Sequence, residues 1–129
     1  MIMCAILMSI KPEFVKQIFV GTKKFEFRKR ACKQEVDKIY IYSTTPVMKV
    51  VGEVQVEDVL IGKPEDIWKY TKQYAGIKKD FFDKYYLDKE QAVAYKLGCV
   101  MEYDRPKELV DFGVKTAPQS YQYIDLKAM

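Results

Sequence analysis

The sequence predicts an α+β fold: a small, curved, mainly antiparallel β-sheet or partial barrel with short flanking helices. Short β-rich runs alternate along the chain with short helical patterns, which is typical of a mixed domain. The length of 129 residues fits a single domain over 1–129. No internal repeat, low-complexity tract or Gly/Ser-rich linker divides the chain.

The beginning of the chain predicts a strand, a helix and a second strand. The continuous apolar run over 3–9 is typical of a buried strand. Pro12 suits the first turn of a helix over 12–20, which Gly21 would end. Aromatic and charged residues then alternate over 24–29, which indicates a strand with its aromatic side chains inward and its charged side chains on the other face.

The remainder predicts further strands and short helices. The expected elements are a strand around 39–42, a turn over 43–46, a long strand over 47–59, a helix opening at 64–66, a helix over 78–86, a strand over 90–99, a short strand at 109–110, and a short helix or turn opening at 118–120. Gly52 lies inside the long strand and is expected to mark a bulge where the strand bends. Trp68 is expected to anchor its helix in the core.

The composition excludes several kinds of chemistry. Without histidine, the chain cannot form a Ser-His-Asp or Cys-His nucleophile pair, a His-containing zinc site or an imidazole general base. The three cysteines form no C-x-x-C motif, so we expect no metal site and ordinary reduced thiols in a cytoplasmic protein. Cys4 and Cys99 are expected in the core, and no cofactor is expected. The apolar N-terminus lacks a basic region and is too short to span a bilayer, so we expect neither a signal peptide nor a membrane partner.

The positive charge is concentrated near the start of the chain. The net charge of +4 divides into +6 over residues 1–50 and −2 over residues 51–129. Residues 22–33, TKKFEFRKRACK, contain six basic residues and one acid. A one-signed stretch of this kind favours an anionic partner, although a solvated charged surface has the same composition.

The segment SIKPEFVKQIFVGTKKFEFRKR over 9–30 resembles the opening signature of ASCH domains, in which a strand ending in S-I-K-P precedes a helix and the motif G-x-K-x-x-E-x-R. Further similar segments follow in order: IYSTTPVMKVVGEVQVEDV over 41–59, a Trp-containing helix, YAGIKKDFFDKYY over 74–86, QAVAYKL over 91–97 and APQSYQYI over 117–124. The resemblance implies a PUA-like β-barrel with flanking helices. It also implies RNA binding as the chief activity, with a candidate role in regulating transcription or translation, and some members of the family are enzymes.

The first group of candidate site residues comprises Lys11, Lys23, Glu26, Arg28 and Arg30. In a PUA-like barrel they would border a cleft, where Lys and Arg donate hydrogen bonds to phosphate oxygens. Glu26 could accept a hydrogen bond from a base amino group or simply pair with a neighbouring cation. The alternative is a solvated basic edge strand with internal ion pairs.

Two polar loops supply the other candidates. Tyr42, Ser43 and Thr44 carry hydroxyls at a strand end, which could bind phosphate or a base edge or make local turn hydrogen bonds. Gln119 and Ser120 follow a proline, and a short helix starting there would present its N–H groups to an anion or be capped by Ser120.

Three functions follow from these candidates. The first is a module that binds RNA or a nucleotide-like small molecule. The second is an enzyme, either a ribonuclease or an amidohydrolase of N4-acylated cytosine nucleosides, for which the resemblance implies Lys23, Glu26 and Glu65 as catalytic residues. Glu26 replaces the threonine of such amidohydrolases and removes a nucleophilic hydroxyl. The third is a protein-interaction or regulatory module, which would be favoured if acids from 51–129 neutralised the basic surface.

Overall fold

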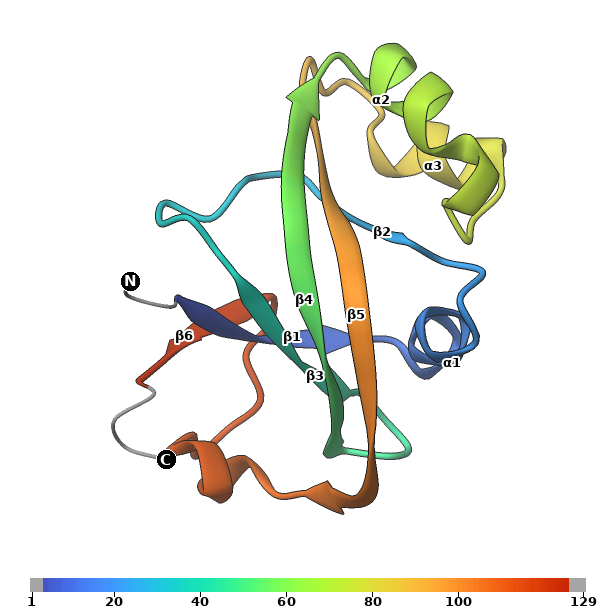
Figure 1. The fold of residues 1–129 in the computed structure, drawn as a ribbon. Helices are drawn as coiled ribbons and strands as arrows, with labels where there is room; N and C mark the ends of the chain where they lie inside the picture. Colours follow the sequence, from blue (N-terminus) through green and yellow to red (C-terminus); the bar gives the residue numbers. More distant parts are fainter. Residues whose placement is uncertain (1–3, 126–129) are drawn as a thin grey trace.

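The computed structural model describes residues 4–125, which form a six-stranded mixed sheet in the order β2-β5-β4-β3-β1-β6 (Figure 1). The elements are β1 (Ala5–Ile10), α1 (Pro12–Val20), β2 (Phe25–Arg28), β3 (Lys38–Ser43), β4 (Lys49–Gly62), α2 (Pro64–Thr71), the 3-10 helix η1 (Lys72–Tyr74), α3 (Lys79–Tyr85), β5 (Ala92–Lys107), the 3-10 helix η2 (Leu109–Phe112) and β6 (Tyr121–Ile124). β1 and β3 are parallel, and the other four strand pairs are antiparallel. The sheet curls into a half-barrel, which confirms the predicted fold class.

β1 is a central strand with two buried faces. It lies between β3 and β6, and its residues alternate between two apolar clusters, with Ile6 and Met8 in one and Ala5 and Leu7 in the other. Burial on both faces explains why the strand is a continuous apolar run rather than an alternating one. The strand begins and ends slightly later than predicted, and Met3 lies outside the described residues.

α1 follows the predicted bounds of 12–20. Pro12 occupies its first turn, where the missing N–H leaves no hydrogen bond unmade. Gly21 follows the last helical residue with φ of 89°, and its N–H donates to the carbonyls of Gln17 and Ile18. The left-handed backbone at Gly21 turns the chain from α1 toward β2.

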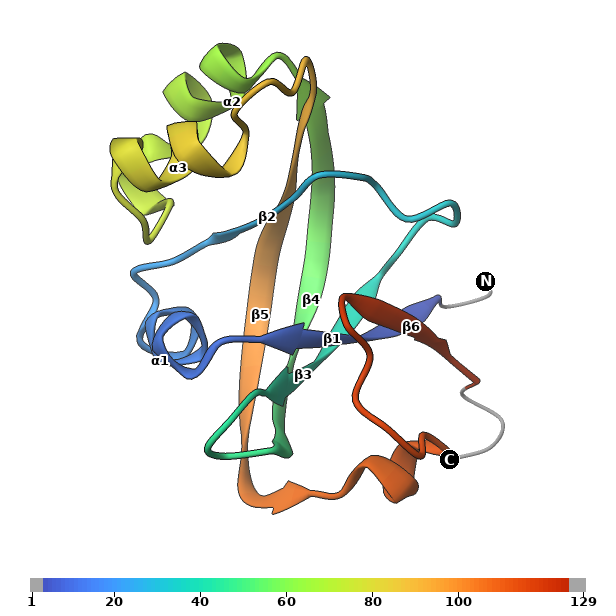
Figure 2. The ribbon, with the colours of Figure 1, turned by 180° about the vertical axis from the view of Figure 1, so that it is seen from behind.

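The two longest strands, β4 and β5, form a ribbon along the molecule (Figures 1 and 2). The predicted bulge lies beside Gly52, because Ile41 pairs with Gly52 and Tyr42 pairs with Val50, leaving Val51 as the extra residue. A Cβ at Gly52 would lie 2.5 Å from the Met101 carbonyl oxygen, so glycine permits the close approach of the strands.

α2 and α3 lie together at one end of this ribbon (Figure 2). Phe82 of α3 packs edge-on against Phe27 of β2, with 5.3 Å between the ring centroids. The buried apolar residue of α2 is Ile67. Trp68, expected as the core anchor, is half-buried because it faces α3, where its ring lies 5.0 Å from that of Phe82.

The structure corrects the prediction of a strand at 109–110. These residues begin the 3-10 helix Leu109–Phe112, because Glu108 and Asp111 cap each other's backbone and Gly113 ends the turn with φ of 72°. The preceding strand β5 continues to Lys107, well beyond the predicted 90–99.

The prediction that Cys99 is a core residue is wrong, whereas Cys4 is partly buried and packs against the core. Cys99 is exposed, because the second half of β5 has a largely solvent-facing burial pattern, and Cys4 is half-buried near the beginning of β1. Across residues 4–125, no helix is long and apolar enough to cross a membrane.

Candidate functional site

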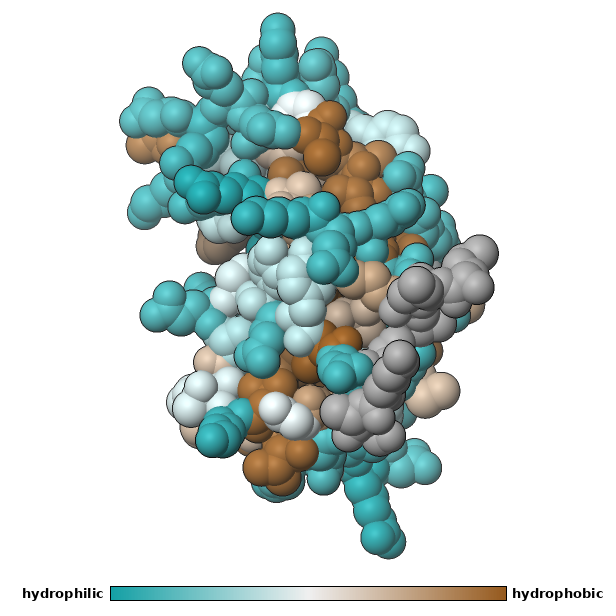
Figure 3. Space-filling view, turned by 90° about the vertical axis from the view of Figure 1, so that its left-hand side faces the viewer, coloured by the Kyte–Doolittle hydropathy of each residue, from teal (hydrophilic) through white to brown (hydrophobic). Residues whose placement is uncertain are grey.

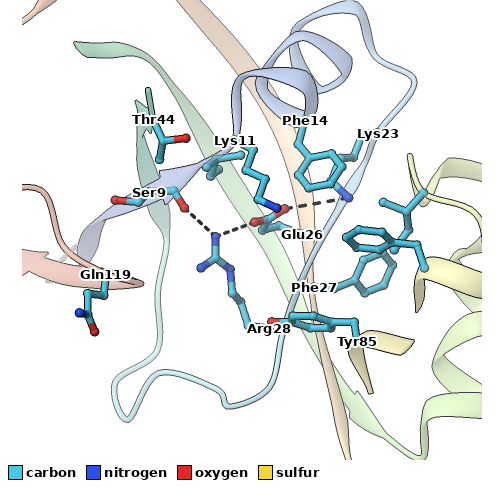
Figure 4. Close-up of a pocket in the computed structure, with 13 residues that line it drawn as sticks. Ser9, Lys11, Phe14, Lys23, Glu26, Phe27, Arg28, Thr44, Tyr85 and Gln119 are labelled. Atoms are coloured by element: carbon cyan, nitrogen blue, oxygen red, sulfur yellow. Dashed lines mark hydrogen bonds and ion pairs between the residues drawn. The ribbon is translucent and has the colours of Figure 1, made fainter. Parts of the chain in front are cut away.

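A pocket of about 360 Å³ opens where α1, β1, β2 and the α3 region meet (Figure 4). It is lined by Ser9, Ile10, Lys11, Phe14, Lys23, Glu26, Phe27, Arg28, Thr44, Ile77, Phe81, Tyr85 and Gln119. The walls are therefore aromatic and aliphatic, and charged groups lie among them. Pockets of this composition are typical of ligand sites.

Lys23 is the most unusual group in the pocket, because its side chain is only 2% exposed. Its ammonium donates a hydrogen bond to the Ala75 carbonyl oxygen at 2.7 Å. The same nitrogen lies 5.1 Å from the ring centroid of Phe14 and 4.9 Å from that of Phe27, so both rings contribute cation–π attraction. Burial lowers the pKa of Lys23 to about 8, although the charge of Glu26 opposes that shift.

The turn at Ala75–Gly76 holds Lys23 in place. Gly76 has φ of 71°, and a Cβ there would lie 2.7 Å from the Cβ and Cγ atoms of Lys23. The backbone N–H of Lys24 also donates to the Tyr74 carbonyl oxygen at 2.8 Å. The segment after α2 therefore fixes the ammonium of Lys23 and the backbone of Lys24, the two residues that precede β2.

Glu26 lies between two cations, which approach it from opposite sides (Figure 4). Its Oε2 accepts a hydrogen bond from Arg28 Nη2 at 2.7 Å, and its Oε1 lies 4.0 Å from Lys23 Nζ. The Glu26 side chain is 7% exposed and therefore not solvated, although β2 is an edge strand and Glu26 makes the internal ion pairs that the alternative expected. Burying a charge without partners costs several kcal/mol, and the two cations offset this cost.

Arg28 joins β2 to the other side of the pocket. Its Nη2 also donates to the Ser9 carbonyl oxygen at 3.0 Å, and its Nη1 donates to Ser120 Oγ at 3.3 Å. Ser9 Oγ in turn donates to the Pro118 carbonyl oxygen at 2.6 Å. Arg28 Nε is buried and has no hydrogen-bond partner among residues 4–125.

The structure brings together six of the predicted site residues. Those that line the pocket are Lys11, Lys23, Glu26, Arg28, Thr44 and Gln119. Ser120 lies next to it through its contact with Arg28. The residues at 118–120 form a bend before β6 and no helix, so the expected helical anion site is absent there.

Four predicted residues lie elsewhere. Tyr42 is buried with Tyr40 in the apolar cluster on the opposite face of β3, because residues two apart share a face. Ser43 is 2% exposed and does not line the pocket. Arg30 is exposed beyond the end of β2, and Glu65 is exposed on α2, away from Lys23 and Glu26.

Several pocket residues were not predicted. Phe14 and Phe27 have core periodicity, and only their position beside Lys23 distinguishes them from ordinary core residues. Ile77, Phe81 and Tyr85 enter the pocket because the α3 region packs beside β2, which local sequence patterns do not reveal. Across residues 4–125, no group of three or more His, Cys, Asp or Glu side chains could hold a metal ion.

The profile of the ASCH domain matches residues 8–104. The chain belongs to the ASCH domain family. Crystal structures of ASCH from Zymomonas mobilis superpose on it with a TM-score of 0.86 and 27% identity, covering 96% of this chain and 90% of that one. A point mutant of the same protein gives a TM-score of 0.87 at 26% identity. The predicted PUA-like architecture is therefore confirmed.

The curated relatives of this ASCH chain differ in size and name. An ASCH domain-containing ribonuclease from Zymomonas mobilis is 32% identical over 92 residues, which cover 70% of this chain and 62% of the relative. The large ribosomal subunit protein uL22 of Ureaplasma parvum is 34% identical over 121 residues, or 92% of this chain. This ASCH chain spans 39% of the length of that protein. An ATP synthase subunit alpha of the same organism is 28% identical, and the chain spans 15% of its length.

The lowered pKa of Lys23 predicts a pH dependence of stability. The folded protein releases this proton near pH 8, whereas the unfolded chain holds it to about its ordinary value of 10.5, so folding gains stability as the pH rises between these values. We expect the free energy of unfolding of wild type, minus that of Lys23→Met, to increase by about 1–2 kcal/mol between about pH 8 and about pH 10. Urea unfolding at several pH values measures this difference, and a constant or falling difference would contradict the buried environment of Lys23.

Proposed function

We propose that this chain binds single-stranded RNA and holds one nucleotide in the pocket. The observation that carries the proposal is the triplet of buried Lys23 and Glu26 with half-buried Arg28, in an open pocket with aromatic walls. Desolvated charges with perturbed pKa values cluster at functional sites. Apolar residues of similar volume would stabilise the fold as well as a buried ion pair does, so the charges are better explained by a ligand. The family is RNA-associated, and a curated relative is a ribonuclease.

The pocket offers a separate contact for each part of a nucleotide. The rings of Phe14, Phe27 and Tyr85 supply flat apolar surface for a base, and stacking on aromatic rings is a common way to hold unpaired bases. Lys23 Nζ and Glu26 Oε1 place a donor next to an acceptor, which matches the alternating groups of a base edge. Lys11 is exposed at the rim, where its ammonium can meet a phosphate.

The charge distribution favours RNA over a protein partner. Of the ion pairs within residues 4–125, only Lys38–Glu53 and Lys49–Glu108 join the basic first part of the chain to acids of the later part. Lys23 and Arg28 pair with Glu26 of their own segment, which leaves the triplet with a net positive charge. Few acids of the later part therefore pair with the basic first part, contrary to what is expected of a neutralised interaction surface.

A second candidate function is cleavage of the bound RNA. It is favoured by a lysine of pKa about 8 that lies 4.0 Å from a carboxylate, because the neutral form of such a lysine is populated near pH 8 and can take the proton of a ribose 2′-hydroxyl. Attack of that oxygen on the adjacent phosphorus breaks the bond to the 5′-oxygen, which takes a proton from the protonated lysine or from water and leaves as a hydroxyl. The upstream fragment then ends in a 2′,3′-cyclic phosphate. Arg28 would stabilise the charge that develops on the phosphate oxygens. The amidohydrolase receives less support, because Glu65 lies outside the pocket.

Binding is tested with a fluorescent single-stranded RNA of about eight nucleotides at about 50 mM salt. We expect Lys23→Met and Glu26→Gln each to weaken binding by about tenfold or more, because each removes a charged hydrogen-bonding group from the base edge. Lys72→Gln is the control, since Lys72 is exposed on η1 and does not line the pocket. Fluorescence anisotropy measures the affinity, and thermal melts confirm folding. No binding by wild type, or equal binding by folded variants, would overturn the proposal.

Cleavage is tested by incubating wild type with the same RNA and analysing the products by mass spectrometry. We expect fragments ending in a 2′,3′-cyclic phosphate, and none from RNA whose 2′-hydroxyls are methylated, because the attacking oxygen is then blocked. Lys23→Met should lower the rate at least about a hundredfold, as loss of a general base does. Intact RNA after prolonged incubation with binding-competent wild type would exclude cleavage and leave the binding proposal standing.

A further inference from the structure

The segment that follows β2 carries an exposed row of positive charge beginning at the pocket. Arg28 lines the pocket, and Lys29, Arg30 and Lys33 continue from it with exposed side chains. Figure 2 shows this segment leaving β2, passing across the β4–β5 ribbon and turning back into β3. The turn of this segment lies at the left of Figure 1. Figure 3 shows the same side of the molecule facing the viewer, and a band of hydrophilic side chains crosses it between apolar patches.

This row is physically connected to the pocket. Lys29 Nζ lies 4.8 Å from the ring centroid of Tyr85, and Tyr85 is one of the pocket walls. A nucleotide held beside Tyr85 would therefore direct its neighbouring phosphate toward Lys29. Residues 29 to 33 span at most about 13 Å, which is short enough to follow only a few nucleotides.

The backbone of the segment is fixed, although its charged side chains are free in solvent. The N–H of Cys32 donates to Tyr95 Oη at 2.9 Å, and the N–H of Gln34 donates to Tyr123 Oη at 2.9 Å. Val36 is buried in the core. A rigid backbone that presents lysine and arginine to solvent loses less entropy on binding an anion than a mobile loop does.

The described acids near this segment form no ion pair with its cations, although Glu35, Glu57 and Asp58 line the same hollow as Lys33. Asp37 accepts a hydrogen bond from the Cys4 N–H at 2.9 Å, so its carboxylate is turned to the beginning of β1. Within residues 4–125, no ion pair involves Lys29, Arg30 or Lys33. Lys29 and Arg30 therefore present exposed positive charge next to the pocket, and Lys33 lies further along the segment beside acids.

We propose that residues 29–33 bind the phosphate backbone of the RNA on one side of the pocket nucleotide. The natural ligand is then a single strand of several nucleotides rather than a free nucleotide. This inference rests on the proposed RNA binding and extends the RNA-binding surface from the pocket to residues 29–33. Phosphate contacts of this kind add affinity and register without reading sequence.

The test compares two triple variants with the same loss of charge. The first is Lys29→Gln, Arg30→Gln and Lys33→Gln in one chain. The control is Lys69→Gln, Lys72→Gln and Lys89→Gln, three exposed lysines of the helical end that line none of the pockets. Each variant is titrated with an RNA of about eight nucleotides and with a dinucleotide, at several salt concentrations.

We expect the 29–33 variant to bind the longer RNA at least about tenfold more weakly than wild type. The slope of the logarithm of its binding constant against the logarithm of the salt concentration should be shallower by about two, because three cations are lost. Dinucleotide binding should weaken much less, because a dinucleotide has a single linking phosphate that can reach only Lys29, and the control should bind both RNAs like wild type. Equal affinity of wild type and the 29–33 variant for the longer RNA would overturn the proposal that residues 29–33 bind the phosphate backbone. It would leave the pocket proposal intact. Competition by a polyglutamate peptide as effective as competition by RNA would also overturn it, since the segment would then be a general anion surface. A wild type that binds neither RNA would instead contradict the proposed function itself.

Discussion

The pocket depends on one electrostatic constraint, the Glu26 carboxylate held between the Lys23 ammonium and the Arg28 guanidinium. None of the three charges can be buried alone, because the desolvation of an unpaired ion costs several kcal/mol. Together they pair with one another, the Ala75 and Ser9 carbonyls accept further hydrogen bonds from the two cations, and the group keeps a net positive charge. The pocket is thus stable without a ligand and still attracts an anion.

The surrounding fold serves to hold this triplet in place. The short strand β2 places Glu26 and Arg28 two residues apart, and therefore on the same side of the strand. The Ala75 carbonyl fixes the Lys23 ammonium from the helical end, and the Ser9 carbonyl fixes Arg28 from the end of β1. Tyr86 Oη also lies 2.8 Å from the Arg28 carbonyl oxygen, which joins α3 to the end of β2. Three parts of the chain that are distant in sequence thus meet at one buried charge.

Much of this arrangement was predictable from local patterns. The bounds of α1 follow from Pro12 and Gly21, and the bulge beside Gly52 follows from a glycine inside a β-branched run. The alternation around Glu26 correctly placed the charged side chains on one face of β2. It could not show that this face is buried, because the residues that cover it come from the end of β1 and from the α3 region. Tyr42 was misplaced for the related reason that the face of β3 it occupies is set by pairing with neighbouring strands.

The state of Lys23 tests the central claim most directly. Heteronuclear NMR follows the Hε–Cε signal of Lys23 as the pH is changed, and so reports whether its amine is charged in the folded protein. The titration is run with and without a bound RNA of about eight nucleotides. The account predicts a pKa near 8 in the free protein, where burial opposes the charge, and a higher pKa when RNA places an acceptor beside the ammonium. A free-protein pKa near the ordinary 10.5, unchanged by RNA, would contradict it.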